Sequence, residues 1–105
     1  MPLNKVRKLA KSLIYKFCPG YSFRFFPSCE FDDEVLGCCC WGLHKRVELS
    51  RTFAKTKSKD EIYKVLLHEI AHAINTDDGH KQKWRDTCLI LGGDGKQFYE
   101  KLSTE

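Results

Sequence analysis

Residues 66–72 read Leu-Leu-His-Glu-Ile-Ala-His, and the rest of the chain can be interpreted outward from this heptad. On an α-helix, residues four apart share a face, so His68 and His72 can direct two imidazole nitrogens at one point. Glu69 follows about 100° further round the helix and can lean over the same point. Two imidazoles beside a carboxylate are typical of a catalytic zinc site. The pattern therefore predicts His68 and His72 as Zn²⁺ ligands and Glu69 as the catalytic base.

The residues before the heptad indicate a helix independently of it. Ser58 followed by Glu61 is a capping box, which marks a helix start, and Asn75 can close the helix as a C-cap. This context favours a metal site over the alternative, which is two surface histidines beside a salt-bridging glutamate. The buried side of the helix is expected to comprise Ile62, Val65, Leu66, Ile70 and Ala73.

A catalytic zinc usually takes three protein ligands, so a third must come from elsewhere. Residues 76–79 form a predicted turn, after which His80 begins a helix that should run to Leu91. A side chain at that position can face back across the turn, and we favour His80 as the third ligand. Oxygen ligands remain as alternatives, either in the turn or further downstream: Asp77, Asp78, Asp86, Asp94 and Glu100.

The N-terminal half predicts a helix followed by strands. Apolar residues recur at helical spacing over 4–17, with Asn4 as a plausible N-cap. An aromatic, alternating segment indicates a strand at 21–27 and an alternating one a strand at 45–50, with a further strand expected at 36–41 and 51–57 as a connector. We thus expect an α+β, zincin-like single domain with an N-terminal helix, a small antiparallel three-stranded sheet, the H-E-x-x-H helix and a third-ligand helix. A short last helix over 96–102 is also possible.

Composition limits the class of protein. The 105 residues with 42% hydrophobic content suit one globular domain, and no apolar run approaches a membrane span. The N-terminus lacks the apolar core of a signal peptide, so we expect a cytoplasmic or nuclear protein that is not secreted, and a monomer.

The net charge is +4. A basic cluster on the first helix is either a solvated face or a contact for single- or double-stranded DNA: Lys5, Arg7, Lys8, Lys11 and Lys16.

Six cysteines are present, and three of them are consecutive. Because secretion is not indicated, we expect reduced thiols that act mostly as small apolar residues. A second metal bound by Cys29 with the 38–40 run is the alternative. The cysteines are Cys18, Cys29, Cys38, Cys39, Cys40 and Cys88.

Residues 37–93 resemble the SprT-like family of zincin metallopeptidases. In that family a Gly-His pair after H-E-x-x-H supplies the third zinc ligand, so the resemblance also implies His80. Members commonly have a glycine directly after this histidine, whereas Lys81 stands there in this chain. Larger members also carry a C-terminal zinc-binding module that this sequence does not match, so we expect 1–105 to be the peptidase domain alone. The segments that carry the resemblance are Val47-Glu48-Leu49-Ser50, Leu66–Ala73, Gly79-His80 with Trp84, and Leu91-Gly92-Gly93.

The resemblance implies a zinc metalloendopeptidase that cleaves protein substrates. The family's eukaryotic member is a DNA-dependent protease, which adds DNA-bound or DNA-crosslinked proteins as candidate substrates. An extended substrate would pair with an edge strand near residues 38–42.

Trp41 and Trp84 are expected in the core. The alternative function is a DNA-binding module whose zinc site is structural or inactive. Candidates for a second electrophile facing the oxyanion are His44, Tyr63 and Lys83.

Overall fold

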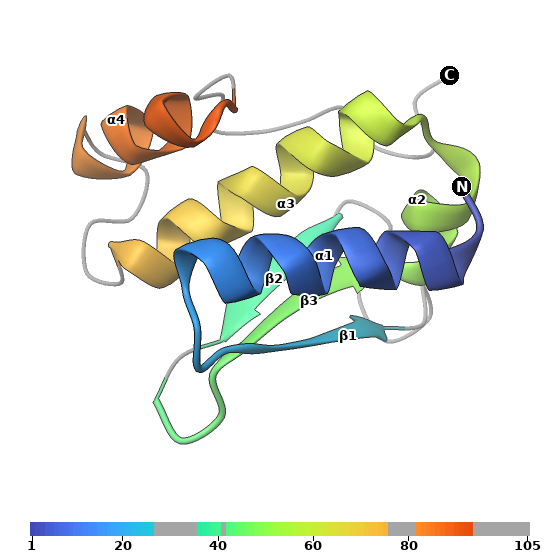
Figure 1. Ribbon diagram of the computed structural model, residues 1–105, viewed down its shortest axis with the longest axis horizontal. Helices are drawn as coiled ribbons and strands as arrows, with labels where there is room; N and C mark the ends of the chain where they lie inside the picture. The colour runs from blue at the N-terminus through green and yellow to red at the C-terminus, as the bar shows by residue number, and fades with distance from the viewer. Residues whose placement is uncertain (27–35, 41, 76–81, 94–105) are drawn as a thin grey trace.

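The computed structural model describes residues 1–26, 36–40, 42–75 and 82–93, and its helices and strands follow the predicted order (Figure 1). One helix precedes three strands, and the remaining helices follow them. The architecture is therefore α+β, as expected. In chain order the elements are α1 (Leu3–Phe17), β1 (Ser22–Phe26), β2 (Gly37–Cys40), β3 (Arg46–Ser50), α2 (Arg51–Thr56), α3 (Lys59–Ile74) and α4 (Gln82–Leu91).

The sheet is mixed, so the prediction of an all-antiparallel sheet is wrong. Its order is β1-β3-β2, which places β3 in the centre. β2 and β3 pair antiparallel, as predicted, through a turn in which Gly42 has a φ of 103°. β1 instead runs parallel to β3, with Phe23 opposite Val47 and Phe25 opposite Leu49. A parallel pair needs a long connection, and residues 27–45 provide it.

Helices α1 and α3 lie side by side over the sheet (Figure 1). The apolar stripes predicted on both helices face the core, although Ala73 of α3 is only half-buried, and the alternating Phe23 and Phe25 of β1 are buried. Asn4 is not the N-cap, because α1 already begins at Leu3 and Pro2 occupies the capping position. The central core comprises Val6, Ala10, Leu13, Ile14, Cys18, Phe23, Phe25, Leu36, Val47, Leu49, Phe53, Ala54, Ile62, Val65, Leu66, Leu67 and Ile70.

Helix α2 occupies most of the segment that was predicted as a connector. Ser50 ends β3 and caps this helix, because its hydroxyl oxygen accepts a hydrogen bond from the Phe53 amide at 3.2 Å. Phe53 and Ala54 are buried, so the short helix closes one end of the core. The connection from β3 to α3 is therefore ordered and fixes where α3 begins.

Some predictions fall outside the described residues. These are the possible helix over 96–102, the burial of Trp41, and the predicted helix start at His80. Within the parts of the chain that the structure does describe, no helix is both long enough and apolar enough to cross a bilayer.

Candidate metal centre

Helix α3 carries the H-E-x-x-H motif and starts where the capping box predicts. The Ser58 hydroxyl accepts a hydrogen bond from the Glu61 amide at 3.3 Å. In return, the Glu61 carboxylate accepts one from the Ser58 amide at 3.4 Å. Asn75 is the C-cap, also as predicted. The caps fix the helical phase over the whole element, so His68 and His72 lie one turn apart on the same face.

The two histidines and the glutamate converge. The ring centroids of His68 and His72 are 4.9 Å apart, with the planes nearly perpendicular. His68, Glu69 and His72 can each offer one ligand atom, with all of these atoms within 4.8 Å of one another. His68 and Glu69 are buried, and His72 is half-buried. Two imidazoles one helical turn apart are donors that suit zinc, so His68 and His72 fit the predicted ion, with Glu69 beside them as the predicted base.

Trp84 of α4 supports both histidines from the neighbouring helix. Its indole Nε1 donates a hydrogen bond to the His68 carbonyl at 3.1 Å. Its ring meets the His68 ring edge-on at 4.8 Å and stacks on the His72 ring at 5.4 Å, with 24° between the planes. Trp84 is fully buried, so its predicted core position is confirmed. A further hydrogen bond ties the end of α3 to α4, from Asn75 Nδ2 to Thr87 Oγ1 at 2.7 Å.

Glu69 is a buried carboxyl group close to a metal-binding candidate. Its Oε2 lies 3.9 Å from His68 Nε2. Burial raises the pKa of Glu69 from 4.5 to about 8, because an ionised carboxylate loses hydration in the interior. A carboxyl group with a pKa near neutrality can both accept and return a proton, which is what a catalytic base must do.

Strand β2 runs close to Glu69, and a glycine permits the approach. A Cβ atom added at Gly37 would lie 3.2 Å from Glu69 Cγ and 3.1 Å from Val65 Cγ1. Burial and, next, the charge of Glu69 raise the pKa of Cys39 above its usual range, which agrees with this proximity. The role of Gly37 was not predicted from the sequence. A glycine at a strand position was the available signal, since such a residue often marks a close backbone approach.

The third-ligand candidates lie mostly outside the described residues. His80, Asp77, Asp78, Asp94 and Glu100 all do, so the assignment of His80 stays a prediction. Asp86 is exposed on α4 and accepts a hydrogen bond from Gln82 at 2.6 Å.

The candidates for a second electrophile occupy three different elements. His44 is exposed in the β2–β3 turn, Tyr63 is half-buried on α3 against the central core, and Lys83 is exposed on α4. The choice among these three therefore stays a prediction as well.

Comparison with known proteins supports the resemblance drawn from the motif. The family model described as SprT-like family matches residues 11–101, from within α1 to beyond α4. Searches of curated proteins and of solved structures gave no match. The family match covers most of the chain and contains both histidines, the glutamate and Trp84. This protein therefore belongs to the SprT-like family.

Proposed function

We propose that this protein is a zinc-dependent metalloendopeptidase that hydrolyses protein substrates. The observation that carries the proposal is the convergence of His68, Glu69 and His72 on one face of a capped helix. Membership of the SprT-like family supports it, because that membership suggests a metallopeptidase.

In this proposal His68, His72 and His80 hold the metal. Trp84 contacts both histidines of α3 and follows His80 by four residues. Four residues span at most about 14 Å, and this chain length is compatible with a ligand at His80. Asp77 and Asp78 remain the alternatives, since they lie in the same connection.

The catalytic chemistry divides between the ion and Glu69. A bound zinc ion would supply Lewis acidity for the scissile carbonyl and for water. Glu69 takes a proton from the attacking water and returns it to the leaving amine. Its burial keeps the carboxylate poorly hydrated, which makes it a stronger base than an exposed glutamate.

We further propose that β2 forms one wall of the substrate site. Within the described part of the sheet β2 is an edge strand, so the hydrogen-bonding groups on its outer side can pair with an extended peptide. Its first residue, Gly37, lies against Glu69. A peptide added along β2 would therefore run past the proposed base.

The first experiment separates catalysis from metal binding. Glu69→Gln should retain zinc and abolish cleavage of an unfolded protein substrate, including any self-cleavage. Asp60→Asn, which changes an exposed carboxylate on the same helix, should cleave at the parental rate. Cleavage by the Glu69→Gln protein at the parental rate would refute the assignment of the base.

The second experiment tests the ligands by elemental analysis of the purified protein. His80→Ala should lower the zinc content sharply, whereas His44→Ala, which alters an exposed histidine in a turn, should leave it unchanged. Full zinc content in His80→Ala, combined with a loss in Asp77→Ala or Asp78→Ala, would move the third ligand to a carboxylate.

DNA contact is a second proposal, and the outer face of α1 favours it. All five basic residues of that helix are exposed, while its apolar stripe is buried. Binding through phosphates should weaken steeply with salt. Lys8→Glu combined with Lys11→Glu should weaken binding to single- and double-stranded DNA, and Lys59→Glu on α3 is the matched control. Equal binding by both proteins would exclude α1 as the contact, and salt-dependent binding without any proteolysis would favour a binding module.

A further inference from the structure

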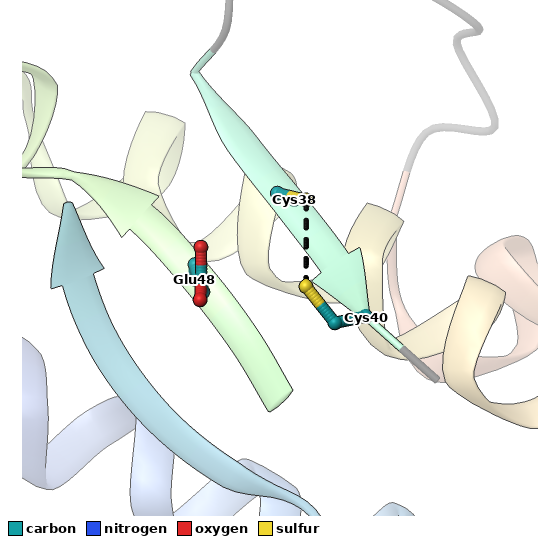
Figure 2. A group of neighbouring side chains, drawn as sticks. All are labelled: Cys38, Cys40 and Glu48. Atoms are coloured by element: carbon teal, nitrogen blue, oxygen red, sulfur yellow. Dashed lines mark hydrogen bonds between the residues drawn. The ribbon is translucent and has the colours of Figure 1, made fainter. Parts of the chain in front are cut away.

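A second group of metal-ligating side chains lies on the sheet, on strands β2 and β3 (Figure 2). Cys38 and Cys40 are two residues apart on β2, so their side chains share one face of the strand. Cys38 is paired directly with Glu48 of the central strand β3. One ligand atom from each of the three residues lies within 4.8 Å of the others. None of these residues belongs to the H-E-x-x-H group.

The two sulfur atoms are spaced as in a shared metal site. Their separation is 3.9 Å. Two thiolates bound to one tetrahedral zinc ion at about 2.3 Å each lie about 3.8 Å apart. A disulfide would require about 2.05 Å. Both cysteines are half-buried, so an ion can reach them from solvent.

Glu48 is buried, and two arginines flank it. Arg24 Nε lies 2.8 Å and Arg46 Nε 3.0 Å from the same oxygen, Glu48 Oε2. The Arg24 contact is a hydrogen bond, whereas Arg46 Nε makes no hydrogen bond among the described residues and is held by charge alone. With both thiols protonated, the five side chains carry a net charge of +1. Exchange of two thiol protons for one divalent cation leaves that charge unchanged, so the arginines do not exclude an ion.

We propose that Cys38, Cys40 and Glu48 form a second metal site that takes a thiolate-preferring divalent ion such as Zn²⁺ or Cd²⁺. Two sulfur donors select such ions over Mg²⁺ or Ca²⁺. A bound ion would join β2 to β3 across the sheet. Its ligand Cys38 directly follows Gly37, the residue at which β2 lies against the proposed catalytic base. The site is independent of the peptidase assignment, because it shares no ligand with it.

Proton release accompanies binding at this site. Burial, and then the neighbouring Cys40, raise the pKa of Cys38 to about 12. A thiol must lose its proton to bind a metal, so affinity should rise with pH.

The test is a Cd²⁺ titration of the full chain, kept reduced with a phosphine and followed by the ultraviolet absorption of cadmium–thiolate bonds. The histidine site contains no sulfur, so this band reports only cysteines. The parent should saturate the band with one thiolate-bound Cd²⁺ per chain, and Zn²⁺ should displace that Cd²⁺. Cys38→Ser and Cys40→Ser should each bind Cd²⁺ roughly tenfold more weakly or worse, a loss of about 1.4 kcal/mol. Cys39→Ser, on the same strand but the opposite face, should titrate like the parent.

Two results would overturn the proposal. One is a parent protein with native far-ultraviolet circular dichroism and no thiolate band. The other is an unchanged band in folded Cys38→Ser and Cys40→Ser, which would place the sulfur ligands elsewhere. Should either serine variant lose its fold, Cys38→Ala and Cys40→Ala provide the same reading without a buried hydroxyl.

Discussion

Substitution of Glu69 by glutamine should stabilise the metal-free protein at pH 7 and have little effect at pH 5. The folded state holds the Glu69 proton up to a pKa of about 8, whereas the unfolded chain releases it at about 4.5. Unfolding therefore releases a proton between these two values, and the free energy of unfolding must fall as the pH rises through that window. Glutamine carries no ionisable proton, so this decrease in the free energy of unfolding does not occur in the variant.

The size of this stability difference follows from the number of pH units between the pKa of Glu69 in the unfolded chain and the pH of the assay. From 4.5 to pH 7 is roughly 2.5 pH units, which at about 1.4 kcal/mol per unit corresponds to a cost of about 3 kcal/mol in the parent. At pH 5 the same calculation gives less than about 1 kcal/mol. The advantage of Glu69→Gln should accordingly grow by about 2–3 kcal/mol between pH 5 and pH 7.

Urea unfolding with excess chelator, followed by tryptophan fluorescence at both pH values, measures this difference. Titrating groups remote from Glu69 are common to both proteins and cancel, and the neighbouring His68 adds to the difference only where it becomes protonated. Asp60→Asn, an exposed carboxylate on the same helix, should shift the free energy of unfolding equally at both pH values. An advantage of Glu69→Gln that stayed constant or shrank as the pH rose would refute the claim that burial raises the pKa of Glu69.

Trp84→Phe removes the indole hydrogen bond to the His68 carbonyl and should cost about 1–2 kcal/mol in urea unfolding, together with a measurable loss of zinc affinity in a chelator competition. Gly37→Ala forces a Cβ atom against Glu69 and the β3 backbone and should lower the free energy of unfolding by about 1–3 kcal/mol. Ser58→Ala removes the capping box and should cost about 1 kcal/mol in thermal unfolding.

Matched variants make these three results interpretable. Leu89→Ala, at a half-exposed position on α4, and Ser12→Ala, exposed on α1, should each change stability by less than about 0.5 kcal/mol. Trp84→Phe with unchanged zinc affinity would show that the indole does not position the histidines. A stable Gly37→Ala protein would mean that β2 can move away from α3 at little cost.

Helix boundaries were predictable where local chemistry determines them. The Ser58–Glu61 capping box involves only four consecutive residues, and the apolar stripe of α1 can be identified from the helical period alone. The same locality explains why His68, Glu69 and His72 could be placed together from sequence. Helix α2 was missed because Ser50 both ends a strand and caps a helix, and only its strand role was considered.

Long-range arrangement was not predictable in the same way. The pairing of β1 with the far side of β3 depends on a connection whose path no local pattern encodes. Glu48 alternates with Val47 and Leu49 as an outward-facing residue would, yet it is buried, and Arg24 of β1 and Arg46 of its own strand both contact its carboxylate. Those contacts exist only once the strand order is set.

The contact of Trp84 with both histidines couples α4 to the proposed metal centre. A fluctuation that lifts α4 from α3 would remove the ring that stacks on His72, so in the proposed metal site the apparent zinc affinity should scale with the fraction of time the helix is docked. Gly93, just beyond α4, fits against Cys88 so closely that an added Cβ atom would meet its sulfur at 2.7 Å. A substitution there should therefore weaken zinc binding without altering a single ligand, and zinc content becomes a measure of how firmly the last described helix is seated.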